Sequence, residues 1–264
     1  MKNSILFSFC TFAFFSCTKV IDINLNNADK QIVVEGEISN QAGPYLIKIS
    51  ETVNFSESNN YPPVKNAQVF VEDNLGNKDT LVESTPGNYY TQNLIGVPGR
   101  TYFLKVTVGD KKLSAKCTMP NNIPLDTVRF LKSNFGGNNT DVNYAAIPEF
   151  LDPPTLGNCF RFIQKANDTL DKSFIVDNDN LINGLKYQRP IFSQGFTTRL
   201  NDTFTLEMQN IDVSIYNYFN SLNESIGNGP GGGATPANPV SNIEGGALGY
   251  FSAHTSQKKT VIVK

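Results

Sequence analysis

The chain has little of the material from which catalytic and metal sites are built. Its 264 residues include one histidine, His254, no tryptophan and four cysteines. A single histidine excludes motifs such as H-E-x-x-H, and any Ser-His-Asp or Cys-His arrangement would have to use His254. No G-x-S-x-G nucleophile elbow occurs in the sequence. We therefore expect no metal, no cofactor and no catalytic residue, with His254 exposed or hydrogen-bonded near a terminal strand.

An excess of positive charge is also missing. The chain carries 22 Lys and Arg against 24 Asp and Glu, a net charge of −2, with both signs interspersed. Binding along nucleic-acid phosphates needs a basic stripe, so we expect no nucleic-acid partner. Long blocks of Ala, Leu, Glu and Lys are absent, whereas Gly (20) and Pro (14) are abundant. This balance favours strands and turns over helices.

No apolar run is long enough for a membrane-spanning helix. The longest, from Ile5 to Phe15, is roughly half of the ~20 residues that a spanning helix needs. A short positive start before such a run is typical of a secretory signal peptide. Cys17 follows Ser16 directly, which resembles the relaxed lipoboxes of Bacteroidetes, where this thiol is acylated, as with palmitate. We predict a signal peptide over 1–16 and a lipidated tether over 17–30. A plain cleaved signal and an uncleaved anchor are the alternatives.

Two cysteines remain after this processing. Cys10 leaves with the signal peptide and Cys17 would carry lipid, which leaves Cys117 and Cys159. In an exported protein these two could form a single disulfide between the halves of the chain. Two isolated buried thiols are the alternative, and two cysteines are too few for a four-thiolate zinc site.

The first half of the mature chain is dense in strand signals. Residues 101–108 alternate between apolar and polar side chains, and Gly109-Asp110 predicts a hairpin into 111–117. Seven such short strands, with turn signals every eight to twelve residues, predict a β-sandwich over 31–120. Two prolines, at positions 120 and 124, end this unit.

The second half, 121–264, is predicted to be a β-rich domain with one helix. Ile215, Tyr218, Phe219, Leu222 and Ile226 recur at helical spacing, which predicts a helix near 212–226. The strand-like segments of this half are 126–133, 142–150, 159–166, 202–211 and the closing KKTVIVK.

Two stretches imitate ligand-binding loops. In DNDNLING (177–184), an EF-hand count from Asp177 places Leu181 and Ile182 where an oxygen ligand and a glycine are required, so we expect a solvated turn. In GNGPGGG (227–233), a phosphate loop would need a following Lys-Ser/Thr, which is absent, so a flexible linker is the better interpretation.

Several longer segments carry a family resemblance. They are IVVEGEIS, AQVFVEDNLGN, GNYYTQNLIGVPGRTYFLKVTV and the ending NPVSNIEGGALGYFSAHT. Together they resemble the DUF4249 family of Bacteroidetes outer-membrane-associated lipoproteins over essentially the whole mature chain. The resemblance implies an N-terminal sandwich similar to Ig-like or carboxypeptidase-regulatory-like domains. It also implies companionship with TonB-dependent receptors, and it implies no catalytic residue.

The C-terminal block is the most specific part of the resemblance, and it supplies the candidate contact residues. They are Asn242, Gly245, Gly246, Tyr250 and Phe251, with the loop 228–239 beside them. Their glycines suit close backbone approach, either to a neighbouring strand or to a partner, and packing is the simpler interpretation.

We therefore expect a non-enzymatic accessory or binding protein, anchored by its lipid to the outer membrane on the periplasmic or the cell-surface face. Its expected partner is a TonB-dependent β-barrel receptor engaged in nutrient uptake. A cell-envelope hydrolase acting on peptides or glycans, and a structural or adhesion module, are the alternatives.

Overall fold

The computed structural model describes residues 29–54, 57–133, 143–227 and 238–264. Within these ranges the chain forms seventeen strands and one helix, so the predicted mainly-β class with a single helix is confirmed. The strands of the first half are β1 (Ile32–Ser39), β2 (Leu46–Glu51), β3 (Gln68–Asp73), β4 (Lys78–Thr80), β5 (Val82–Thr85), β6 (Asn88–Tyr90), β7 (Thr101–Val108) and β8 (Lys111–Thr118). Those of the second half are β9 (Thr127–Ser133), β10 (Asn143–Leu151), β11 (Cys159–Ala166), β12 (Thr169–Leu170), β13 (Ile175–Asn178), β14 (Lys186–Tyr187), β15 (Thr203–Ile211), β16 (Ile243–Glu244) and β17 (Leu248–Ile262).

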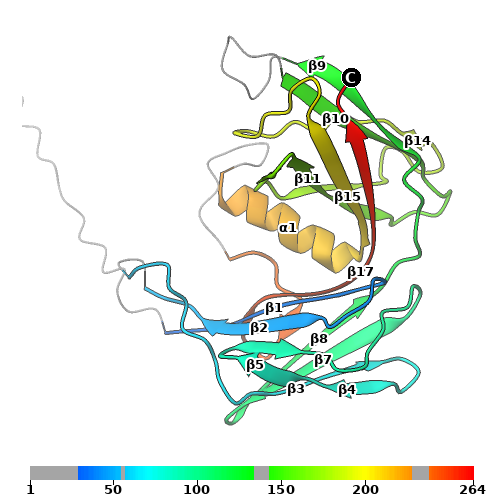
Figure 1. Cartoon of the computed structure of the whole chain (residues 1–264). Helices are drawn as coiled ribbons and strands as arrows, with labels where there is room; N and C mark the ends of the chain where they lie inside the picture. The colour runs from blue at the N-terminus through cyan, green and yellow to red at the C-terminus, as the bar shows by residue number, and fades with distance from the viewer. Residues whose placement is uncertain (1–28, 55–56, 134–142, 228–237) are drawn as a thin grey trace, which may run out of the picture.

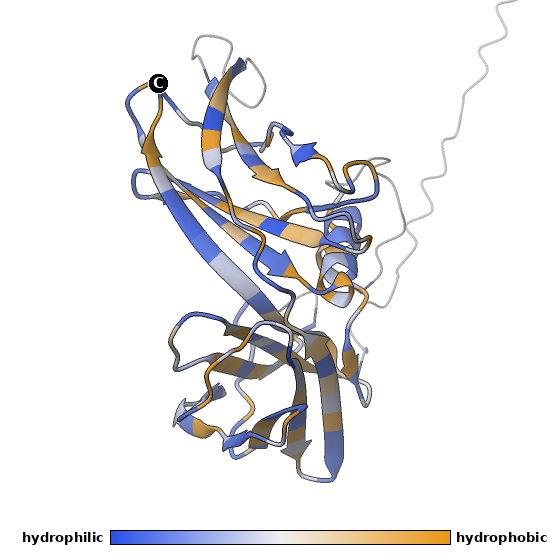
Figure 2. Ribbon diagram, turned by 90° about the vertical axis from the view of Figure 1, so that its right-hand side faces the viewer, coloured by the Kyte–Doolittle hydropathy of each residue, from blue (hydrophilic) through white to orange (hydrophobic). Residues whose placement is uncertain are grey.

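Two sheets enclose the first hydrophobic core in the lower part of the molecule (Figure 1). One is the five-stranded sheet β16-β8-β7-β3-β4. The other is the β17-β1-β2-β6-β5 portion of a nine-stranded sheet. Both sheets are amphipathic because side chains alternate across a strand, which Figure 2 shows as bands of orange and blue. In β1, for example, Val34 and Ile38 are buried in the core while Glu35 and Glu37 lie on the other face.

The predicted hairpin is present. β7 and β8 pair antiparallel from Thr101↔Thr118 to Val108↔Lys111, and Gly109 turns the chain at a φ of 55°. Tyr102, Leu104 and Val106 line the core, as their spacing predicts.

The long strand β17 joins the two halves of the molecule. Its first residues pair parallel to β1, from Val33↔Leu248 to Ser39↔His254, and its later residues pair antiparallel to β15. The sequence predicts a strand only at its end, because its middle is polar and interrupts the apolar pattern. Residues between Ile243 and Ala253 pack into the first core. The predicted sandwich domain, 31–120, therefore lacks residues that complete its own hydrophobic core.

The second core lies in the upper half. There the three-stranded sheet β14-β10-β9 covers the face of β11 and β15 that points away from α1 (Figure 1). Aromatic rings fill this core: the Phe150 ring stacks on Tyr187 at a centroid distance of 4.7 Å and lies 4.8 Å from Phe160.

The helix α1 (Val213–Ser225) coincides with the predicted helix to within a residue at each end. Asp212 caps it by accepting a hydrogen bond from Ser214 N at 2.8 Å, and the same carboxylate accepts from Thr118 N at the end of β8. Ile215 and Phe219 are buried against the sheet. Among the described residues, no helix combines the length and apolar character needed to cross a membrane.

Candidate functional site

A polar groove of about 570 Å³ lies at the place where the two halves meet. We call it the junction groove. Its side chains come from the outward face of β1 and β2 and from the face of β15 and β17 that α1 partly covers. They are Glu35, Glu37, Ser39, Gln41, Pro44, Tyr45, Leu46, Lys48, Glu207, Gln209, Tyr250, His254, Ser256 and Lys258. The groove thus exists only when both halves are folded.

Glu37 connects the two halves through its carboxylate. It accepts a hydrogen bond from the Tyr250 hydroxyl at 2.8 Å and forms an ion pair with Arg161 of β11 at 3.1 Å. Burial raises the pKa of Glu37, but the charge that His254 carries when protonated at acid pH, the charge of Arg161 and the Tyr250 hydrogen bond outweigh burial, so the pKa lies below its usual value. Glu37 is therefore held as a carboxylate at neutral pH.

His254 lines the groove and is only 3% exposed. Its Nδ1 is 3.0 Å from Ser252 Oγ. Burial lowers the pKa of His254 below 6.5, and Arg161 lowers it further, although the negative charges of Glu37 and Glu207 oppose this. The expectation of a hydrogen-bonded histidine in a terminal strand agrees with this position, but the ring is enclosed rather than on the surface.

A second acid, Glu207, is held at the other end of the groove. Its carboxylate accepts from Ser256 Oγ at 2.7 Å and from Gln209 Nε2 at 2.9 Å, and it pairs with Lys258 at 3.1 Å. Burial raises its pKa, but these three donors lower it below the usual value. Glu35 pairs with Lys48 at 3.5 Å. The groove thus presents carboxylate and ammonium groups side by side. This arrangement suits a polar or zwitterionic ligand rather than an apolar one.

The helix α1 borders the groove through aromatic contacts. The Tyr250 ring lies 4.8 Å from Tyr218 and 5.1 Å from Phe219, and the Arg161 guanidinium lies 4.2 Å above the Phe219 ring. Burial raises the pKa of Tyr218 to about 12. These contacts hold Tyr250 and Arg161 in fixed positions around Glu37.

Replacement of His254 by glutamine should change how stability depends on pH. Because the folded state disfavours protonated His254, the wild-type chain loses stability as the pH falls below 6.5, where the unfolded histidine takes up its proton. Urea unfolding midpoints between pH 5 and pH 8 should fall less steeply in His254→Gln than in the wild type. Identical pH profiles would show that the enclosed ring is not held neutral.

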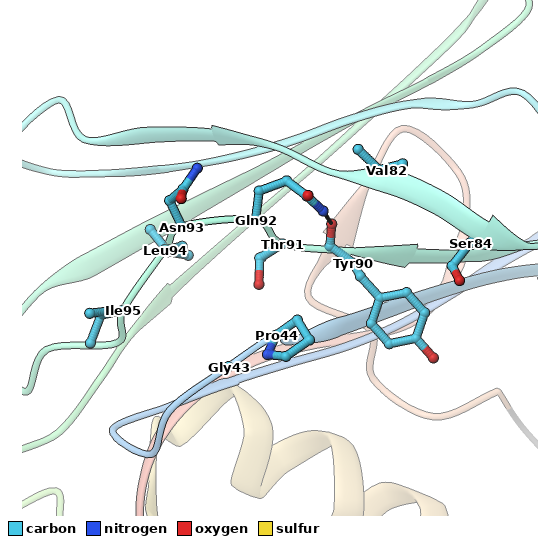
Figure 3. A pocket seen from close by; sticks show the side chains of 10 residues that line it. All are labelled: Gly43, Pro44, Val82, Ser84, Tyr90, Thr91, Gln92, Asn93, Leu94 and Ile95. Carbon is cyan, nitrogen blue, oxygen red and sulfur yellow. Dashed lines mark hydrogen bonds between the residues drawn. The ribbon is translucent and has the colours of Figure 1, made fainter.

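A second hollow, of about 680 Å³, lies beside the junction groove and shares Pro44 with it. Figure 3 shows it between the Gly43-Pro44 turn, the strands β5 and β6, and the loop 91–95, with Tyr90 at one end and Ile95 at the other. Although this hollow is larger, none of its lining residues is charged. The junction groove is therefore the stronger candidate site.

The structure uses most of the sequence-predicted contact residues for packing. The Asn242 side chain pairs with the backbone of Phe251 in both directions, at 2.8 and 2.9 Å, and Phe251 is fully buried. Gly245 has a φ of 94°, and a Cβ there would lie 2.4 Å from the Lys112 carbonyl. Gly246, with a φ of 81°, has nothing within 4 Å of its Cβ position. Of the five residues, Tyr250 alone lines the groove.

The disulfide considered for Cys117 and Cys159 is not formed, and both thiols are buried and free. Cys117 lies against β17, where its sulfur accepts from Ala253 N at 3.1 Å, whereas Cys159 begins β11 and pairs across the sheet with Asn178 and Ile211. Burial, reinforced by the charge of Asp179, raises the pKa of Cys159 to about 12. The alternative of two isolated thiols describes the structure.

Three of the predictions fall outside the described residues. These are the signal peptide over 1–16, the lipidation of Cys17 with most of the tether over 17–30, and most of the loop 228–239. In the part of the chain that is described, no cluster of three or more His, Cys, Asp or Glu is arranged to hold a metal ion.

The charged residues of the groove were missed by the sequence analysis. The alternation in β1, which places Glu35 and Glu37 on the face opposite Val34 and Ile38, is a signal that could have indicated them. Their meeting with Arg161 and Glu207 depends on the pairing of distant strands, which no local pattern reveals.

The fold and site define a mainly β protein in which one long strand joins a sandwich to a second β-rich half. The family model described as Domain of unknown function (DUF4249) matches residues 18–260, so the chain belongs to this family. No curated protein matches the chain.

Proposed function

We propose that this protein is a lipid-anchored accessory or binding protein of the outer membrane, and that it binds its partner or ligand through the junction groove. The observation that carries the proposal is the groove itself, which both halves build from fixed, paired charges. Rigid polar groups of both signs are suited to specific recognition. The full proposal is that the partner is a TonB-dependent β-barrel receptor, that the two proteins act together in nutrient uptake, and that Cys17 carries the lipid.

The anchor can be tested separately from the groove. In cells labelled with a palmitate analogue, the wild-type chain should incorporate label and sediment with membranes. Cys17→Ser should do neither. A labelled Cys17→Ser chain would contradict the assignment of the lipid to this residue.

The groove is tested by charge reversal with a matched control. Lys48 forms a cross-strand pair with Glu35 in the groove, and Lys105 forms a pair of the same 3.5 Å length with Glu72 on the opposite sheet. Both pairs are exposed, and each contributes no more than about 1 kcal/mol to stability. Lys48→Glu should reduce co-purification of a large β-barrel receptor from detergent-solubilised membranes at least tenfold, and Lys105→Glu should not. Equal effects, or no co-purifying barrel with the wild type, would contradict the proposal.

A hydrolase is the second candidate, favoured by one contact. Ser252 Oγ lies 3.0 Å from His254 Nδ1, and the charge of Glu37 acts on the same ring. Ser252 is 1% exposed and His254 3% exposed, so a substrate carbonyl cannot reach the hydroxyl in this conformation. Peptide or glycan turnover that is abolished by both Ser252→Ala and His254→Gln would establish the enzyme and overturn the binding role.

A further inference from the structure

Two loops of the second half contain three buried side-chain oxygens that have no hydrogen-bond partner. The first loop, 152–158, follows β10, and the second, 179–185, follows β13. Backbone hydrogen bonds join them at both ends: Asp179 N donates to Asn158 O at 3.0 Å, and Asp152 N donates to Leu185 O at 3.0 Å. The loops are thus held against each other by main-chain contacts.

Each loop contributes a buried aspartate that uses only one of its carboxylate oxygens. Asp152 Oδ2 accepts from Gly184 N at 3.2 Å, and Asp179 Oδ2 accepts from Asn158 N at 2.9 Å. Both residues are 1% exposed, yet Asp152 Oδ1 and Asp179 Oδ1 have no hydrogen-bond partner. Asn183 Oδ1, in the second loop, is buried and unpartnered as well.

These three oxygens form a group distinct from the other unpartnered atoms. Six buried side-chain atoms lack a partner in the described part of the chain, and the remaining three belong to Asn210 and Thr255, which face each other across β15 and β17. The loop atoms are all oxygens of carboxylate or amide groups, with no donor among them. A buried carboxylate oxygen without a partner is costly, and two carboxylates in one place repel each other.

The electrostatics agree with this crowding. The carboxylate of Asp179 lies near enough to that of Asp152 for its negative charge to act on it. A divalent cation would compensate both carboxylates and coordinate the amide oxygen. Oxygen-only ligands are those that Ca²⁺ takes, in flexible arrangements of six to eight, whereas zinc favours nitrogen and sulfur.

We propose that Asp152, Asp179 and Asn183 bind a calcium ion that holds the loop 152–158 to the loop 179–185. The site differs from the EF-hand arrangement that the sequence excludes, because its ligands come from two separate loops. Asp177, from which the EF-hand count begins, is occupied elsewhere: its carboxylate accepts from the Tyr187 hydroxyl at 2.9 Å and from Arg189. This neighbouring acid therefore provides a matched control.

The test is thermal unfolding of the purified chain after EDTA treatment and dialysis, at pH 7.5, with CaCl₂ or MgCl₂ added. Calcium at a hundredfold excess over its dissociation constant should raise the Tm by about 5–10 °C, and magnesium should raise it much less. Titration calorimetry should give one bound calcium per chain. No shift and no heat with calcium would overturn the proposal.

Substitutions separate a cation site from a merely structural cluster. Asp152→Asn and Asp179→Asn should each weaken calcium binding at least about tenfold. In EDTA, these variants should be as stable as the wild type or more so, since each removes one of two repelling charges. Asp177→Asn should lower the Tm equally with and without calcium. Full calcium binding by Asp152→Asn and Asp179→Asn would overturn the site. Stabilisation of the chain at acid pH without any response to calcium would also overturn the proposal. It would show that the two carboxylates share a proton rather than bind a cation.

Discussion

Replacement of Gly249 by alanine should be among the most destabilising single substitutions in this protein. Gly249 has a φ of 100°, and a Cβ at this position would lie 2.0 Å from the carbonyl oxygen of Val34, its partner in the parallel ladder of β1 and β17. No flexible side chain can move aside, because the contact is with backbone. We expect a loss of at least about 3 kcal/mol, near the upper end for point substitutions. Urea unfolding of the full chain measures it.

Gly246→Ala is the matched control for this substitution. Gly246 also has a positive φ, of 81°, but a Cβ there meets no atom within 4 Å. It should therefore cost only the backbone strain, about 1–2 kcal/mol. If both variants lost the same stability, the close approach of β17 to β1 would not be what requires glycine at position 249.

The second large effect concerns the N-terminal half alone: a fragment of residues 29–120 should not fold. It lacks β16 and β17, whose Ile243, Phe251 and Ala253 belong to the first core, and it leaves β1 as an edge strand that pairs only with β2. Loss of one buried phenylalanine side chain costs about 3–5 kcal/mol, against a typical total stability of about 5–15 kcal/mol. Circular dichroism and urea titration should show no cooperative transition.

A linked fragment provides the control. Residues 29–120 joined by a flexible linker to residues 238–255 regain β16 and the β1-pairing part of β17. Of the two fragments, only the one that carries the C-terminal strands should unfold cooperatively. A cooperative transition in 29–120 by itself would establish the boundary at residue 120 as a true domain boundary, and would show that β17 adds to the sandwich without being required for it.

The dependence of the first core on β17 also bears on the proposed function. The junction groove takes Glu35 and Glu37 from β1 and Tyr250 and His254 from β17, which are adjacent strands far apart in sequence. From the second half, Glu207 lines the groove and Arg161 pairs with Glu37. Any change in how the two halves meet would therefore alter the groove, whereas the calcium-site proposal concerns loops of the second half alone.

Local patterns were sufficient for the regular elements. The alternation in 101–108 and the Gly109-Asp110 turn predicted the β7–β8 hairpin, and the spacing from Ile215 to Leu222 predicted α1, because these signals depend on neighbours within a few residues. The middle of β17 gave no such signal. Its Ser252, His254 and Ser256 are buried polar residues, and their partners lie in β1 and β15.

The sequence by itself determined the mainly β class, the position of the one described helix and the family to which the chain belongs, since periodicity, turn residues and motif content are local properties. Only the tertiary structure decided that Cys117 and Cys159 stay apart, that Asn242 and Phe251 serve packing, and that Glu37 lies close to both Arg161 and His254. The physical reason is that strand pairing between distant segments sets these contacts, and β17 forms parallel and antiparallel pairs whose register no single stretch of sequence encodes.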